Sequence, residues 1–141
     1  MHPMQSLVFF LLLFWLGSCS PSCLEDFHCE GEARCRALIE ELQKIQNRDQ
    51  LMSSTPLLKN HFEELATLII HAREFQESHP DKDGPSPLYD HSTSKILEEE
   101  LRRIYAIEGG REIIEGTQQE ALVRLDAFEK MLEKKRELFV K

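Results

Sequence analysis

The sequence predicts an all-α fold, an antiparallel bundle of three or four helices preceded by a signal peptide and a short tether. Apolar residues recur three and four positions apart over most of the chain, which is the period of an amphipathic helix. Neither the alternating pattern of a strand nor a two-residue hairpin turn competes with this periodicity. A length of 141 residues favours a single domain.

The first helix is expected over about 32–52, because apolar residues at helical spacing share one face there: Cys35, Leu38, Ile39, Leu42 and Ile45. The segment Ser53-Ser54-Thr55-Pro56 then predicts an end and a new start. Thr55 can cap free amide groups, and Pro56 suits the first position of a helix. The second helix is expected over about 56–77, with this apolar stripe: Leu58, Phe62, Leu65, Ile69, Ala72 and Phe75.

Residues 79–91 hold three prolines and a glycine and are expected to form a loop. A third helix is expected over about 94–108, with the stripe Leu97, Leu101, Ile104 and Ile107. Gly109-Gly110 predicts a break or kink before a fourth helix over about 111–140, with the stripe Leu122, Leu125, Phe128, Leu132 and Phe139. The capping-box pattern Thr117 to Glu120 also indicates a start. Because a spacing of seven continues across both glycines, one bent helix over 94–140 stays an alternative.

An apolar run occupies residues 7–16, directly before Leu16-Gly17-Ser18-Cys19. Its length suits the core of a signal peptide, roughly 7 to 15 residues, and falls short of the about 20 residues that span a bilayer. The tetrapeptide resembles the lipobox of bacterial lipoproteins. The resemblance implies that the signal peptidase recognises Leu16, Gly17 and Ser18, that residues 1–18 are removed, and that Cys19 is acylated through its thiol. One departure is that no Lys or Arg precedes the apolar run.

The resemblance covers only the leader and Cys19. Residues 19–31, with Pro21 and Gly31, are expected to be the lipidated cysteine and an irregular tether, and residues 32–141 the helical domain. Ser20 resembles the sorting signal of outer-membrane lipoproteins, so the expected location is the bacterial cell envelope, at the outer rather than the inner membrane. Cleavage after Ser20 is the alternative, and it would release a soluble chain that begins at Pro21.

Three further cysteines, Cys23, Cys29 and Cys35, fall in the first quarter of the chain. In an oxidising compartment they are disulfide candidates. Residues six apart on one continuous helix are about 9 Å apart, so a bridge within the chain requires a non-helical segment near Gly31. Pairing between chains, which resembles the cross-linked envelope lipoproteins of chlamydiae, and free thiols are the alternatives. The spacing does not match zinc ligands.

The chain carries a net charge of −8, and residues 1–19 contain no Asp, Glu, Lys or Arg. An acidic domain without clustered basic residues argues against nucleic acid or anionic lipid as a partner. No catalytic constellation, metal site or cofactor motif is recognised: His61 lacks the second histidine of a zinc-protease helix, and Gly109-Gly110 lacks the preceding strand of a phosphate-binding turn.

These observations predict a lipid-anchored envelope lipoprotein without catalytic activity. The lipid on Cys19 holds it to a membrane, and the acidic helical domain binds an envelope protein of unknown identity through a helix face or groove. Self-association into a homo-oligomer stays open. A structural envelope component, cross-linked through Cys23, Cys29 or Cys35, is the second hypothesis, and a soluble secreted helical ligand is the third.

Overall fold

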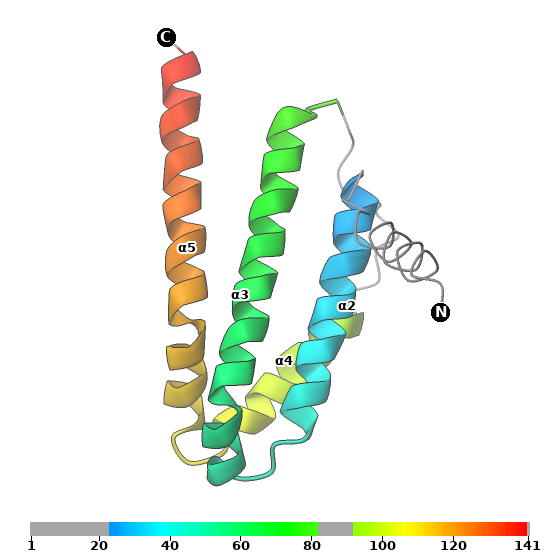
Figure 1. Cartoon of the computed structure of the whole chain (residues 1–141), viewed down its shortest axis with the longest axis vertical. Coiled ribbons are helices and arrows are strands. Elements are labelled where there is room, and N and C mark those ends of the chain that lie inside the picture. Colours follow the sequence, from blue (N-terminus) through cyan, green and yellow to red (C-terminus); the bar gives the residue numbers. More distant parts are fainter. Residues whose placement is uncertain (1–22, 82–91, 141) are drawn as a thin grey trace, which may run out of the picture.

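The computed structural model describes residues 23–81 and 92–140, and these residues are all-α (Figure 1). Four helices occupy them: α2 (Leu24–Gln43), α3 (Arg48–Ser78), α4 (Ser92–Tyr105) and α5 (Gly110–Phe139). The described part contains no strand. The predicted fold class is therefore confirmed, while several helix boundaries differ from those expected.

Helix α2 begins at Leu24 rather than near residue 32, so the irregular tether expected over 19–31 is wrong for residues 24–31; residues 19–22 lie outside the described part. Glu25 and Asp26 occupy the first turn, where carboxylates suit the positive end of the helix dipole. The Phe27 ring packs on Phe75 of α3, with 5.5 Å between ring centroids. Gly31 continues the helix because tertiary packing outweighs its low propensity.

The break between the first two helices lies at residues 44–47 and not at Ser53–Pro56. Asn47 has an extended backbone, and its side chain accepts a 2.9 Å hydrogen bond from the Gln50 N–H, so Asn47 caps α3. Pro56 therefore lies inside α3. It cannot donate to the Met52 carbonyl, which instead accepts a 2.8 Å bond from the Thr55 hydroxyl. This local replacement explains why the proline does not end the helix.

The break between α4 and α5 lies at Gly109, where the sequence predicts it, so two helices form and not one bent helix. Gly109 has a left-handed backbone with φ of 70°, which glycine adopts without strain. A Cβ atom at Gly110 would overlap the carbonyl of Ile104. Thr117 starts no helix: it is buried within α5, where its hydroxyl donates to the Ile114 carbonyl at 2.7 Å.

The direction of each helix follows from the contacts between helices. Helices α2 and α3 are antiparallel, since Phe27 contacts Phe75 while Arg34 pairs with Glu64. Helices α3 and α5 run the same way, because Lys59 pairs with Glu120 and, farther along both helices, Glu77 pairs with Arg136. The predicted antiparallel direction thus holds for α2 and α3 but not for α3 and α5.

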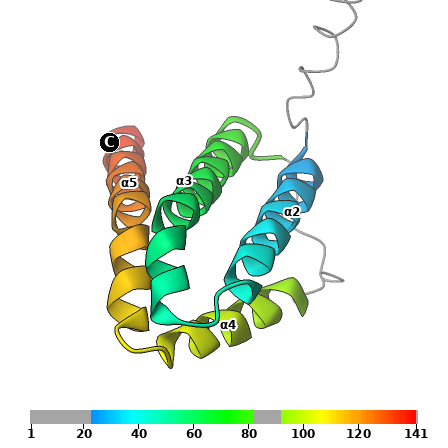
Figure 2. The same cartoon turned by 60° about the horizontal axis from the view of Figure 1, so that its bottom comes forward.

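Helix α4 crosses beneath the other helices and returns the chain to the end from which α3 starts (Figure 2). Thr93 donates to Glu32 near the start of both α2 and α4, and Arg103 donates to the Leu42 carbonyl near their ends. α2 and α4 are therefore also parallel. This crossing segment is the reason that α5 can run alongside α3 in the same direction.

The core lies toward the turns at 44–47 and 106–109, and the helices diverge toward the opposite end (Figures 1 and 2). Its buried residues are Leu38, Leu42, Ile45, Leu51, Leu58, Phe62, Ala66, Ile104, Ile114 and Ala121. Three residues expected in apolar stripes are exposed instead, namely Ile69, Leu122 and Phe139. Ile69 and Phe139 lie beyond this core, toward the end where the helices separate.

Candidate functional site

The residues of the predicted lipidation site, Leu16, Gly17, Ser18 and Cys19, lie outside the described part of the chain. The other three cysteines are described, and all three thiols are free. Cys23 is the half-buried N-cap of α2, Cys29 is exposed and Cys35 is half-buried. The structure therefore places these three cysteines, while the residues of the lipid anchor lie outside the described part.

The continuous helix α2 is not compatible with a Cys29–Cys35 bridge. The segment around Gly31 is helical, so the two residues are about 9 Å apart along the helix axis, beyond the Cα separation of a disulfide. Burial, together with the nearby Glu32 carboxylate, raises the pKa of the Cys35 thiol. Cys35 is therefore a protonated, weakly reactive thiol, and Cys29 is the only exposed thiol of the described residues.

An apolar groove of about 320 Å³ lies between α2 and α3, and the start of α4 borders it. Its described lining comprises Leu24, Phe27, His28, Gly31, Glu32 and Cys35 of α2, Leu65, Leu68, Ile69, Ala72 and Gln76 of α3, and Thr93 and Ser94 of α4. The volume is at the lower end of the range of about 300–1,000 Å³ for ligand sites. We call this feature the α2–α3 groove.

Two residues explain the shape of the α2–α3 groove. A Cβ atom on Gly31 would lie 3.5 Å from Leu68, so the absence of a side chain at Gly31 deepens the groove at this point. Ile69 is 47% exposed although it shares the stripe of buried Leu58 and Phe62, and its side chain lines the groove. Helical periodicity predicted a buried stripe at Ile69 but could not show that this residue borders an open groove.

Two polar residues at the rim of the α2–α3 groove, Glu32 and Thr93, are already hydrogen-bonded. The Glu32 carboxylate accepts hydrogen bonds from Arg36 at 2.6 Å and from Thr93 at 3.1 Å. It also raises the pKa of the Cys35 thiol, as noted above. The groove is therefore an apolar surface with a fixed polar edge, suited to apolar side chains and not to a free cation.

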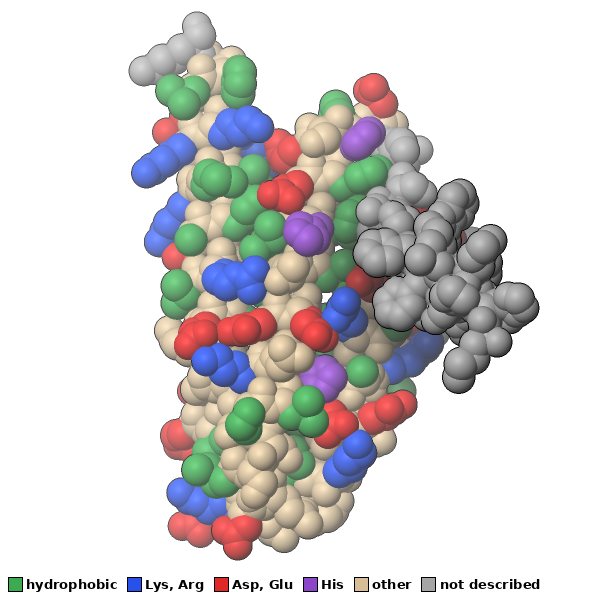
Figure 3. All heavy atoms as spheres, in the orientation of Figure 1, with side chains coloured by type: hydrophobic (Ala, Val, Ile, Leu, Met, Phe, Trp, Pro, Cys, Tyr) green, Lys and Arg blue, Asp and Glu red, His purple; other side chains and the backbone are tan. Residues whose placement is uncertain are grey.

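A second hollow, of about 450 Å³, is polar and is lined by residues of α2, α3 and α5. Arg34 crosses it and binds Glu64 at 2.7 Å and Glu30 at 3.0 Å, while Arg124 donates to Thr67 at 3.0 Å. Acidic and basic side chains lie next to one another over α3 and α5 on this face (Figure 3). Because these charges are paired with one another, the second hollow joins the helices and leaves few groups for a ligand.

Within residues 23–81 and 92–140, no three His, Cys, Asp or Glu side chains gather as metal ligands would. None of the described helices has the length and hydrophobicity needed to cross a membrane. Comparisons of the chain with protein-family models, curated proteins and solved structures find no match. The α2–α3 groove is therefore the candidate site that the described residues themselves provide.

Proposed function

We propose that this chain is a membrane-anchored bacterial lipoprotein that acts as a non-catalytic interaction module of the cell envelope. The lipid on Cys19 attaches it to the membrane, and the α2–α3 groove binds the partner. The observation that carries the proposal is the place of the groove: its lining begins at Leu24, five residues after Cys19. Anchor and binding surface are thus neighbours in the chain.

The chemistry of the α2–α3 groove indicates what the partner presents. Burial of the exposed Ile69 and the half-buried Phe27 against a partner would be favourable, by about 25 cal/mol for each Å² of apolar surface removed from water. An open groove between two helices suits the apolar stripe of an amphipathic helix. We therefore propose an envelope protein with such a helix as the partner.

The intact mass of the mature protein from host membranes tests the anchor. We expect a chain that begins at an acylated Cys19 and lacks residues 1–18. The Cys19→Ala variant should lose both the acyl mass and the membrane association. An unmodified chain that begins at Pro21 and is recovered in the medium would contradict the anchor and support a secreted ligand.

Affinity isolation from envelope extracts tests the α2–α3 groove. Ile69→Glu places a charge in the groove, and Val123→Glu is the matched control, because Val123 is exposed on α5 and does not line the groove. We expect a protein that co-purifies with the wild type and with Val123→Glu but not with Ile69→Glu. Equal recovery with both variants, with unchanged circular dichroism, would show that the groove is not the contact.

The exposure of Cys29 favours a structural role in cross-linked chains as a second function. Cys29 lies nine residues, or two and a half helical turns, before the buried Leu38, so it faces away from the core. Non-reducing electrophoresis should show a dimer that Cys29→Ser removes and Cys35→Ser retains. A wild type that is monomeric in native envelopes without reductant would exclude this role.

A further inference from the structure

The end of α5 differs in charge from the rest of this chain, whose overall acidity argues against an anionic lipid partner but does not describe this end. Residues 130–141 hold five Lys or Arg and two Glu, a net charge of +3, whereas the whole chain carries −8. Within the described residues, Arg136 pairs with Glu77 and Lys130 pairs with Asp126, while Lys134 and Lys135 form no salt bridge. Both lysines are exposed, and Lys134 is free for an external anion, whereas Lys135 lies close enough to Glu77 to help lower the pKa of that carboxyl.

Apolar side chains are exposed at the same end of α5. The exposed fractions are 77% for Leu138, 80% for Phe139 and 87% for Val140. Phe139 follows the buried Leu132 by seven residues and continues the face that packs on α3. α3 ends at Ser78, and α5 extends past that point (Figure 1). The apolar face thus continues after its partner helix has ended.

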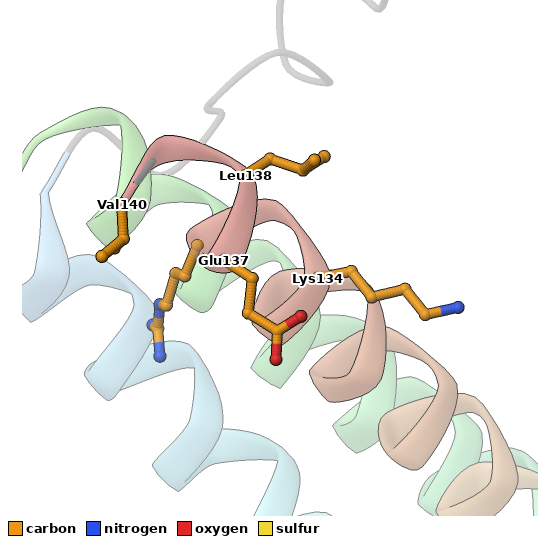
Figure 4. A pocket seen from close by; sticks show the side chains of 5 residues that line it. Lys134, Glu137, Leu138 and Val140 are labelled. Carbon is orange, nitrogen blue, oxygen red and sulfur yellow. The ribbon is translucent and has the colours of Figure 1, made fainter.

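Basic and apolar groups point the same way from α5. Lys134 and Leu138 are four residues apart, and their side chains project to the same side of the helix (Figure 4). A hollow of about 690 Å³ at this end is bordered by Lys134, Arg136, Glu137, Leu138 and Val140. All of these belong to one helix, so the described residues form a protruding surface and not an enclosed ligand pocket.

We propose that this surface, Met131, Lys134, Lys135, Leu138 and Phe139, docks on an anionic lipid bilayer. We call it the α5 tip. The apolar side chains would enter the boundary between headgroups and acyl chains, and the two lysines would meet lipid phosphates.

The topology brings the α5 tip to the membrane side of the molecule. α2 begins and α5 ends at the same end of the molecule, opposite the turns at 44–47 and 106–109 (Figure 1). Cys19 precedes the N-cap of α2 by four residues. This step rests on the proposed lipid anchor, and it makes the tip a second attachment point, since membrane binding strengthens when two signals act together.

Tryptophan fluorescence in reconstituted vesicles tests the α5 tip. Trp15, the only tryptophan, lies in the predicted leader, so Phe139→Trp provides a single reporter in the mature acylated protein. Tyr105→Trp, beside the turn at the opposite end, is the matched control. With phosphatidylglycerol in phosphatidylcholine vesicles, we expect a blue shift and quenching by brominated lipid for Phe139→Trp only.

Charge reversal tests the role of the lysines. Adding Lys134→Glu and Lys135→Glu to Phe139→Trp should weaken docking on phosphatidylglycerol vesicles by about tenfold or more, since each lysine near an anionic surface contributes about 1 kcal/mol. If the emission of Phe139→Trp stays solvent-like and unquenched in phosphatidylcholine vesicles both with and without phosphatidylglycerol, the inference is overturned. A blue shift without vesicles that grows with protein concentration would also overturn it, because a second copy would then cover the tip.

The intact mass tests the lipid anchor independently of the vesicle experiment, because an unmodified Cys19 would show that the anchor is absent. In that case the unacylated Phe139→Trp protein is sedimented with the same vesicles. Binding that requires phosphatidylglycerol and is lost on charge reversal would uphold the α5 tip without the anchor. Absence of binding would overturn the tip inference as well.

Discussion

The guanidinium of Arg103 completes the end of α2 from a different helix. It donates to the carbonyls of Leu42 at 2.6 Å and Ile45 at 2.7 Å, and its Nε–H donates to Glu100 at 2.9 Å. The last carbonyls of a helix have no partner within that helix. The Leu42 carbonyl also accepts from the Ile45 N–H at 3.1 Å, so Arg103 adds a second bond there and binds the Ile45 carbonyl beside it. Arg103 thereby ties α4 to α2.

Replacement of Arg103 should lower the stability of the fold markedly, whereas replacement of the neighbouring Arg102 should have little effect. We expect Arg103→Ala to lower the free energy of unfolding by about 2–3 kcal/mol, because charge-assisted hydrogen bonds to partly buried acceptors are lost. Arg102→Ala removes an exposed pair with Glu98 and should cost less than about 0.5 kcal/mol. Urea unfolding measures both, and equal losses would show that Arg103 does not stabilise the turn.

Two glycines of α5 should respond to alanine in opposite directions. Gly110→Ala should destabilise the fold, because its Cβ would overlap the carbonyl of Ile104. Gly116 is exposed within the helix, and a Cβ there meets nothing within 4 Å, so Gly116→Ala should stabilise by about 0.5–1 kcal/mol. Thermal unfolding of the two variants measures both effects. A higher melting temperature for Gly110→Ala would contradict the prediction, because it would show that the turn before α5 accommodates the Cβ atom without a loss of stability.

The role of Arg103 could not be predicted from the sequence. Its bond partners Leu42 and Ile45 are about sixty residues away, and only the crossing of α4 over the end of α2 brings them together. Nearby residues indicate just a helix-surface pair with Glu100. Gly109 was predictable, by contrast, because the need for a left-handed residue after a helix is local.

At the scale of elements, α3 shows how a local exchange of hydrogen bonds preserves a long helix. The interior Pro56 removes one N–H, and the Thr55 hydroxyl takes its place at the Met52 carbonyl. We expect Pro56→Ala to stabilise the protein by up to about 3 kcal/mol. Thr55→Val should lower the free energy of unfolding more when Pro56 is present than in the Pro56→Ala variant. In that variant the N–H of residue 56 can donate to the Met52 carbonyl, so the Thr55 hydroxyl is no longer needed there. A double-mutant cycle measures this coupling, and a coupling of zero would contradict the exchange.

Most residues of the apolar stripes were predicted correctly, whereas Ile69, Leu122 and Phe139 are exposed and two boundaries differ. Ser53 to Pro56 has the composition of a helix start, but Ser53 and Thr55 bond backward to α3 carbonyls and leave the helix intact. Asn47 is the residue that caps α3, and an asparagine at this place is a signal that the sequence does contain. Gly31 suggested an irregular tether, but α2 continues through Gly31, and the packing of Phe27 on Phe75 stabilises the part of the helix that precedes it.

At the scale of the whole molecule, periodicity identifies the face that a helix buries but carries no information on its direction. The sequence therefore predicted helices and not the parallel pairing of α3 with α5. The same limit applies to the candidate site. The α2–α3 groove exposes Ile69 of a predicted apolar stripe, and the α5 tip lies where the stripe of α5 continues beyond the end of α3, at Phe139. Only the lengths and spread of the helices determine those places.

The parallel pairing of α3 with α5 leads to a dependence of stability on pH. Hydrogen bonding from Arg136 lowers the pKa of Glu77, and hydrogen bonding from Lys59 lowers that of Glu120. A carboxyl whose pKa is lower in the folded chain stabilises the fold at pH values above the pKa of the unfolded chain. That contribution is lost as the pH falls through the lowered, folded-state pKa. Acid should therefore loosen the contact between α3 and α5.

Thermal unfolding between neutral and acidic pH measures this contribution. We expect the combined variant Glu77→Gln and Glu120→Gln to lose less stability on acidification than the wild type, because neither amide titrates. The control is Glu98→Gln, since Glu98 is an exposed residue of α4 that takes no part in the α3–α5 contact. Its loss of stability on acidification should match that of the wild type. Because the pairs are exposed, high salt should also reduce the difference. A combined variant with the wild-type pH profile would show that α5 is held to α3 by Phe128 and Leu132 alone and not by its charged pairs.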